Sequence, residues 1–339
     1  MELLDKAVSQ LLYPPILFFV LGMFAALVRS DLKISSELGA AMRLFLLCAI
    51  GLKGGVGIAK AGIGEVLVPA LAAIVLGIGI VLIGYLILTK LKFDVANAGT
   101  IAGHYGAVSA TTMIFGFAYL EEIGVYYEAF APALYPFMDS AAIITAILLT
   151  RVALAKKKRT GIKVNTQEIF KEGIKVNIQE IFKEVVLGKA VLLLMACLVI
   201  GYAGGVEGTA GIMPFFDGMF KGVLCLFMLD MGLIAASRLR DWRIVGHYLV
   251  AYALIMPPVH GIAGVALGSF IGLSVGGATM LGILAASGSY ISAPAAMRAA
   301  IPEANPSLSL TAAVALTFPF NIFVGIPLYY MVAQRIAIN

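Results

Sequence analysis

Two short segments of this 339-residue chain combine residue types that could bind a small ion. Residues 102–112 read AGHYGAVSATT, and residues 285–294 read AASGSYISAP. Glycine weakens a helix interior by about 1 kcal/mol and proline by about 3 kcal/mol, so both segments are expected to interrupt the helices that contain them. At an interruption, backbone N–H and C=O groups lose their helical partners and become available to a ligand.

Two interrupted helices that direct their N-termini at one place would form an anion site, because each N-terminus carries about half a positive charge. Neutral hydroxyl donors could come from Ser109, Thr111, Ser287, Ser289 and Ser292. The freed carbonyls at the other helix ends suit a sodium ion. Close helix packing through small residues is the alternative explanation of the same composition.

Three ionisable residues stand inside apolar runs. Asp139 follows Pro136, which is expected to kink its helix, and a carboxylate in such a run is a functional candidate. It could ligate sodium, carry a proton, or accept hydrogen bonds from an interrupted helix. His104 could titrate near neutral pH or serve packing. His260 follows a break expected at Pro257-Pro258, where a structural role is favoured.

The composition indicates that membrane helices position these residues. Hydrophobic residues make up 61% of the chain and charged residues 13%, against about 45–50% and about 25% in soluble domains. These values exclude a cytosolic enzyme, a nucleic-acid-binding protein, a disordered chain and a secreted disulfide scaffold. The cysteines, Cys48, Cys197 and Cys225, lie far apart in apolar runs and suggest neither a metal site nor a disulfide.

Apolar runs of about 20 residues predict an all-α integral membrane protein with ten transmembrane helices. The expected spans are 11–28, 37–58, 66–89, 95–118, 129–153, 190–206, 215–236, 243–271, 276–297 and 309–333. The two ion-binding candidates fall in spans four and nine, which are therefore expected to be broken.

The loops between these spans carry an uneven charge. Between Arg151 and Lys189 there are ten Lys/Arg against four Glu, and further cations lie on the same side. These further cations are Arg29, Lys33, Lys90, Lys92, Arg238, Arg240, Arg243 and Arg298. The positive-inside rule therefore predicts a cytoplasmic linker at 154–189, with both termini outside. The first residues, MELLDK, lack the basic start of a cleavable signal peptide.

The linker contains a tandem duplication. GIKVNTQEIFKE at 161–172 is followed directly by GIKVNIQEIFKE at 173–184. Each unit could form a short amphipathic helix on the membrane surface or act only as a spacer.

The halves 1–153 and 190–339 show an internal repeat. Gly22 aligns with Gly201 and Gly55 with Gly232. Gly103-His-Tyr aligns with Gly288-Ser-Tyr, and Tyr135-Pro-Phe with Phe318-Pro-Phe, at separations between 177 and 185 residues. Because five spans is an odd number, the second half must be inserted upside down, as in many secondary transporters.

Four strings carry a resemblance to a known family. AGHYGAVSATTM (102–113), ALYPFMDSAA (133–142), HGIAGVALG (260–268) and ASGSYISAPAAMRAAIPEANPS (286–307) resemble the Sbt family of sodium-dependent bicarbonate transporters. The likeness covers nearly the whole chain apart from the linker. It implies a core domain of helices 3–5 and 8–10, a gate domain of helices 1, 2, 6 and 7, and elevator-like alternating access. It also implies a homotrimer in the inner membrane and a PII-like regulatory protein on the cytoplasmic face.

The resemblance also implies where the ions bind. Its substrate-binding positions are Gly106, Ala107, Ser109, Gly288, Ser289 and Ser292, and its cation-binding positions are Asp139, Thr111, Thr112 and Asn321. Cyanobacterial members carry an acidic residue where this chain has Tyr290 and apolar residues where it has His104 and Tyr105. These three residues are candidates for gating or proton linkage.

Sodium-driven uptake of bicarbonate is thus the leading hypothesis. A proton-coupled carrier of another small anion or organic acid is the alternative, and an anion channel is a more remote one. The intramembrane protease motifs GxSG and GxGD and the zinc motif HExxH do not occur, so an enzyme is not expected. Sodium, as coupling ion, is the only metal expected, with no organic cofactor and no nucleic-acid partner.

Two charges away from the ion sites, Arg43 and Asp230, fall within spans two and seven. Each lies about 9 Å from the cytoplasmic end of its span, at 1.5 Å per residue. Because an unpaired charge at this depth is costly, we predict an ion pair between the two helices.

Overall fold

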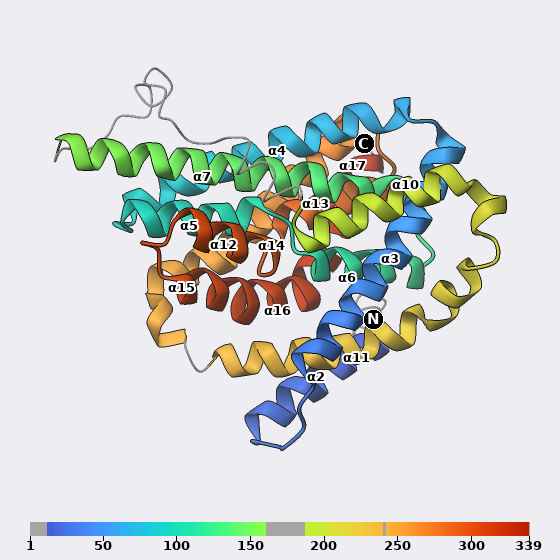
Figure 1. Cartoon of the computed structure of the whole chain (residues 1–339), viewed down its shortest axis with the longest axis horizontal. Coiled ribbons are helices and arrows are strands. Elements are labelled where there is room, and N and C mark those ends of the chain that lie inside the picture. Colours follow the sequence, from blue (N-terminus) through green and yellow to red (C-terminus); the bar gives the residue numbers. More distant parts are fainter. Residues whose placement is uncertain (1–11, 161–186, 240–241, 339) are drawn as a thin grey trace.

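The computed structural model describes residues 12–160, 187–239 and 242–338, and every regular element in these ranges is helical. The duplicated part of the linker, 161–184, lies outside them. The first half contains α2 (Pro14–Leu27), α3 (Ser36–Ala61), α4 (Gly64–Lys90), α5 (Val95–Gly106), α6 (Ala110–Glu122), η1 (Ala131–Ala133) and α7 (Leu134–Thr160). The second half contains α10 (Lys189–Thr209), α11 (Met213–Leu239), α12 (Trp242–Phe270), α13 (Val275–Ala286), α14 (Ser292–Ala300) and a long final helix (Figure 1).

Seven helices of the described ranges are long and apolar enough to cross a membrane. They are α3, α4, η1–α7, α10, α11, α12 and the final helix, Pro306–Ala337. The other three expected spans correspond to shorter helices: α2 has 14 residues, and spans four and nine are each divided in two. The all-helical membrane architecture is therefore confirmed at the level of seven spans.

Spans four and nine are interrupted where glycine and serine gather. The first interruption runs from Ala107 to Ser109, between α5 and α6, and the second from Ser287 to Ile291, between α13 and α14. The first half-helix of each broken span begins in the same way, because the side chain of Asp94 caps α5 and that of Ser274 caps α13. Each half-helix of 12 residues is about 18 Å long and so reaches only to the middle of a bilayer.

One pairing expected from the sequence is wrong in register. Gly103-His-Tyr lies in the last turns of α5, whereas Gly288-Ser-Tyr lies in the interruption after α13. The ends of the half-helices, Gly106 and Ala286, are 180 residues apart. The similarity of the two tripeptides therefore reflects composition and not equivalent position.

Proline acts differently from the expectation at two places. Pro136 lies in the first turn of α7, where its missing N–H needs no partner, so it begins the helix instead of kinking it. The helix α12 is kinked at Gly246, which has a non-helical φ of 73°. From there it continues without a break through Pro257 and Pro258. The expected break before His260 is thus absent, since prolines are tolerated within membrane helices.

Glycines bring two helix pairs into backbone contact. Gly22 of α2 lies against the carbonyl of Leu229, and Gly232 of α11 lies against the carbonyl of Phe19. Gly55 of α3 and Gly201 of α10 make the same reciprocal contact, each lying against the carbonyl three residues before the other. A side chain at any of these glycines would collide with the facing backbone, so α2 packs tightly on α11 and α3 on α10.

The remaining helices pack on one another and, through α6 and the final helix, on these four. α4 contacts α5 and α7, and α12 contacts α13 and α17 (Ile326–Ile338). The final helix changes winding twice, with π-helical turns at η2 (Ala312–Thr317) and η3 (Asn321–Gly325) on either side of α16 (Phe318–Phe320). π-helical turns occur often at functional sites, and these two place Thr317 and Asn321 toward other helices.

Candidate functional site

The two helix interruptions touch each other. The backbone N–H of Ser109 donates to Oγ of Ser287 over 2.9 Å, and the N–H of Ser289 donates to the carbonyl of His104 over 2.7 Å. All four residues are buried. The structure therefore brings the two candidate segments together, as the sequence predicted.

Asp139 of α7 lies beside the first interruption and is completely buried. Its Oδ1 accepts a hydrogen bond from the N–H of Val108 at 2.9 Å and from Oγ of Ser292 at 3.1 Å. Its Oδ2 is buried and has no hydrogen-bond partner among the described residues. A buried carboxylate oxygen without a partner costs free energy, and a hard cation such as sodium would remove that cost.

Three side chains form one hydrogen-bonded chain at the second interruption. Because a carboxylate only accepts, Ser292 donates to Asp139, and Ser289 must donate to Ser292 across 2.8 Å. Oγ of Ser289 in turn accepts from the N–H of Ala293. Ser289 and Ser292 thus connect the start of α14 to the α7 carboxylate.

The two interruptions differ in the amides they leave open. At the first, the N–H groups of Ala107, Val108 and Ser109 all have acceptors within the protein. At the second, the N–H groups of Gly288 and Ile291 have no hydrogen-bond partner among the described residues. An anion would therefore meet free amides at the N-terminal side of α14, where the helix dipole also favours negative charge.

The other cation candidates lie close by, and they differ in the hydrogen bonds that their side chains already make. Thr111 and Thr112 occupy the first turn of α6, and both are buried. Asn321 uses both ends of its side chain, since Nδ2 donates to the carbonyl of Ala286 at 2.9 Å and Oδ1 accepts from Tyr329 at 2.9 Å. Asn321 thus holds the end of α13, and its oxygen has one lone pair left, so its role as a cation ligand stays a prediction.

The three residues considered for gating occupy unlike positions. Nδ1 of His104 lies 2.8 Å from the carbonyl of Thr100 and must carry the proton, while Nε2 is buried without a partner among the described residues. The hydroxyl of Tyr105 lies 2.7 Å from Oγ1 of Thr317, which fixes it inside the core. Of the three, Tyr290 reaches α11, with its hydroxyl 3.5 Å from Sδ of Met231.

The comparison with protein families now decides the class of molecule. The model of the Na+-dependent bicarbonate transporter superfamily matches residues 14–334. The chain belongs to this superfamily. A comparison with curated proteins gave no match. The family is one of membrane transporters and not of enzymes, which confirms both the resemblance and the expectation of a non-enzymatic function.

In this transporter, helix packing leaves no room for a side chain at Gly106. A side chain there would meet Val81 of α4, Ala142 of α7 at 3.1 Å and the carbonyl of Gly77 at 3.1 Å. The lack of a side chain at Gly106 is thus explained by helix contact, and a role toward the anion stays a prediction. Gly288 has more room, because a Cβ atom at this position would have the side chain of Ala313 as its nearest neighbour, at 3.2 Å.

The predicted ion pair between Arg43 and Asp230 is not formed in the described structure. No nitrogen of Arg43 lies within 4.0 Å of the carboxylate, although the two charges still act on each other electrostatically. Asp230 points at Gly39, one turn before Arg43 on α3, and the Arg43 guanidinium lies 5.7 Å from the ring centre of Phe227. The helices face each other as expected, but the side chains leave in different directions.

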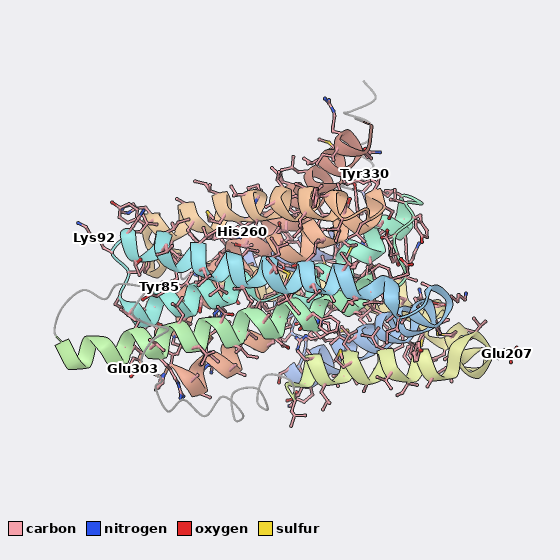
Figure 2. All side chains as sticks on the ribbon, turned by 90° about the horizontal axis from the view of Figure 1, so that it is seen from above. Tyr85, Lys92, Glu207, His260, Glu303 and Tyr330 are labelled. Atoms are coloured by element: carbon pink, nitrogen blue, oxygen red, sulfur yellow. The ribbon has the colours of Figure 1, made fainter. Side chains whose placement is uncertain are left out.

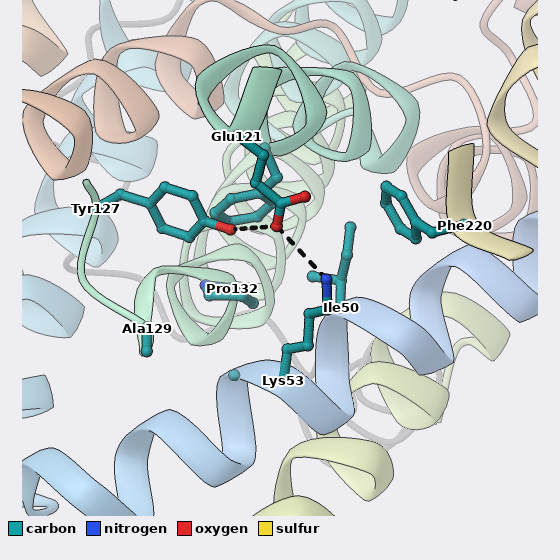
Figure 3. Close-up of a pocket in the computed structure, with 9 residues that line it drawn as sticks. Ile50, Lys53, Glu121, Tyr127, Ala129, Pro132 and Phe220 are labelled. Carbon is teal, nitrogen blue, oxygen red and sulfur yellow. Dashed lines mark hydrogen bonds and ion pairs between the residues drawn. The ribbon is translucent and has the colours of Figure 1, made fainter. Parts of the chain in front are cut away.

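Sequence reasoning missed several groups of this site. The Val108 amide and the Thr317 hydroxyl took no part in the expectations, because an amide has no signature in the sequence and Thr317 approaches from a distant helix. It also missed a cluster at the far ends of the helices, where Lys53 lies 2.9 Å from Asp217 and 3.6 Å from Glu121 (Figure 3). Burial and the nearby Glu121 raise the pKa of Tyr127, whose hydroxyl therefore stays protonated and donates to Glu121.

Proposed function

We propose that this protein imports bicarbonate, driven by sodium. The single observation that carries the proposal is the pairing of free amides at Gly288 and Ile291 with an unpartnered Asp139 oxygen at one helix crossing. The amides suit an anion and the carboxylate oxygen suits a cation. Ser292 joins the two, because it begins α14 and donates to Asp139. Binding of one ion would then favour binding of the other through charge.

We propose that the chain is an inverted repeat of ten spans. The reciprocal glycine contacts support this architecture, because exchanging the two halves turns the pair Gly22–Gly232 into the pair Gly201–Gly55. The helix contacts obey the same exchange, since α4 with α5 corresponds to α12 with α13. On this basis α2, α3, α10 and α11 form the gate domain and the remaining spans form the core domain.

The orientation is also part of the proposal. Lys92 and Glu303 lie at one end of the molecule and Glu207 at the opposite end (Figure 2). We assign the first end to the cytoplasm because the Lys/Arg-rich loops gather there, in the inner membrane of the cell. A homotrimer and a PII-like partner on the cytoplasmic face follow from the family resemblance and are proposed on that basis alone.

The conformation fits an inward-open state of an elevator-type carrier. At the outer end, Lys53 of the gate meets Glu121 of the core (Figure 3). Lys221 of the gate lies 2.7 Å from Glu122 of the core. At the inner end, a cavity of about 800 Å³ separates gate helices from core helices and reaches Tyr290 and Ile291. Substrate bound at the second interruption would therefore leave toward the cytoplasm.

Uptake of labelled bicarbonate into proteoliposomes tests the function. We expect saturable uptake that rises with an inward sodium gradient and is absent without sodium. Uptake that does not depend on sodium but rises with an inward proton gradient would favour the alternative, proton-coupled transport of a small anion. That alternative draws on the same buried carboxylate and on the unpartnered Nε2 of His104. Non-saturable flux would indicate a channel.

A further inference from the structure

The inner cavity carries a concentration of positive charge that transport of a small anion does not explain. Three arginines from three helices line it: Arg43 of α3, Arg238 of α11 and Arg298 of α14. Among the described residues that line the cavity, none is Asp or Glu. Its volume, about 800 Å³, is within the range of sites for small organic ligands and far exceeds the space that one inorganic anion needs.

Helix dipoles account for only part of this cluster. Arg238 and Arg298 lie in the last turns of their helices, where cations are favoured. Arg43 lies about two turns inside α3, where neither helix end stabilises its charge, and it forms no ion pair within the described residues. Its Nε is buried and lacks a hydrogen-bond partner there. A buried guanidinium donor without an acceptor is the feature that a bound anion would satisfy.

The cavity also lies on the path to the proposed substrate site. Tyr290 and Ile291, from the second interruption, form part of its wall. Arg43 and Arg238 belong to the gate, whereas Arg298 belongs to the core. A ligand that contacts Arg43 and Arg298 would therefore connect the two domains and occupy the route by which substrate leaves.

We propose that this cavity is a second anion site, which binds a small molecule with two or more phosphate or carboxylate groups. Arginine forks bind both groups in the same two-point manner, and the forks of Arg43 and Arg298, which come from two helices, suit a ligand with more than one anionic group. The bound polyanion holds gate and core in the inward-open arrangement, so it inhibits uptake from the cytoplasmic side. The inhibition rests on the proposed transport function, but the binding does not.

Binding is measured on the purified full-length protein by titration calorimetry, with pyrophosphate and citrate as probes and acetate as the single-charge control. We expect saturable binding of pyrophosphate, citrate or both, and none of acetate at the same concentration. Arg298→Gln, an exposed position that should fold normally, lowers the affinity about ten- to a hundred-fold, the range for one charged hydrogen bond. Arg43→Gln does the same.

Arg335→Gln is the matched control, because Arg335 is also exposed and lies in the last turn of its helix, but it does not line this cavity. Binding of neither probe, or equal affinity in wild type and Arg298→Gln, overturns the proposal. Stronger binding of pyrophosphate than citrate identifies phosphate as the preferred group, and the reverse order identifies carboxylate.

A second measurement separates this proposal from the transport function. Pyrophosphate trapped inside proteoliposomes that carry cytoplasmic-side-in protein inhibits labelled bicarbonate uptake, and pyrophosphate added outside does not. Arginine-dependent binding in a protein that fails to transport bicarbonate refutes the proposed substrate and keeps the second site. If the protein binds no probe, takes up bicarbonate normally and is not inhibited by luminal pyrophosphate, the second site is refuted. The proposed transport function is then unaffected.

Discussion

The backbone N–H of Ser109 and the hydroxyl of Ser287 join the two interrupted helices, 178 residues apart in sequence and 2.9 Å apart in space. The Ser287 hydroxyl donates a hydrogen bond to the carbonyl of Leu284, so its oxygen is free to accept from Ser109. The contact is buried and holds one interruption against the other. It makes the crossing a single unit and not two neighbouring flexible segments.

Ser287→Ala should separate the two interruptions. The substitution leaves the N–H of Ser109 buried and unpaired, which costs about 1–3 kcal/mol. We expect a lower unfolding temperature in detergent and a higher KM for bicarbonate. Ser237→Ala is the control, because that hydroxyl is exposed and bonds only within its own helix. Equal stability of the two variants would contradict a role of the Ser109–Ser287 bond.

Asp139→Asn should remove sodium dependence and preserve the fold. The amide oxygen can still accept from Val108 and Ser292, but the charge that attracts the cation is gone. We expect sodium-stimulated uptake to be lost while the protein still elutes as a folded species. Asp217→Asn, which removes a carboxylate from the outer cluster, should retain sodium stimulation. A wild-type sodium response in Asp139→Asn rules out the assignment.

Gly106→Ala and Gly288→Ala should fail in different ways. At Gly106 a methyl group collides with α4 and α7, and overpacking of this kind costs about 1–3 kcal/mol. At Gly288 the nearest neighbour is the Cβ atom of Ala313 at 3.2 Å, a milder conflict than at Gly106, so stability should fall less while anion affinity falls more. Thermal unfolding with and without bicarbonate distinguishes the two effects. The reverse order of stabilities would show that the packing assignment is mistaken.

Lys221→Gln should weaken the outer contact between gate and core. Its partner Glu122 is partly exposed, and pairs of this kind contribute about 0.2–1 kcal/mol. We expect a shift of the population away from the inward-open state, measured as greater labelling of Ala129→Cys, an exposed position that lines the outer pocket. Lys60→Gln, at the end of α3, is the control. Unchanged labelling in Lys221→Gln would mean that the pair does not hold the outer side closed.

Arg43→Leu and Asp230→Leu should be only weakly coupled. The side chains face different neighbours and do not meet within 4.0 Å, so a double-mutant cycle should give less than about 1 kcal/mol. The pair Lys53 and Asp217, at 2.9 Å, provides a comparison with a formed contact. A coupling energy of about 3 kcal/mol or more for Arg43 and Asp230 would show that they do pair in solution.

Composition was sufficient to locate the helix interruptions. Glycine, serine and proline gather at 102–112 and 285–294, and their effect on a helix is local, so both breaks lie where the sequence places them. The placement of the breaks depends on residue type alone. The nearness of Asp139 to the first break was anticipated through the family resemblance.

Other features depend on three-dimensional detail that residue types do not carry. The role of Gly106 is decided by Val81 and Ala142, which belong to other helices. The direction of the Asp230 side chain toward Gly39 is a matter of rotamer, and helix depth alone suggested Arg43. The open amides of the second interruption follow from which acceptors happen to lie near each N–H.

The backbone contacts at Gly22–Gly232 and Gly55–Gly201 restrict what can move during a transport cycle. Sliding α2 along α11 by one turn, about 5.4 Å, would press ordinary side chains into the facing carbonyls. In the proposed elevator-type cycle, these four helices are therefore expected to move as one rigid frame, and the other spans to supply the displacement. A covalent cross-link between α2 and α11 should leave turnover intact, whereas one between α11 and α14 should stop it.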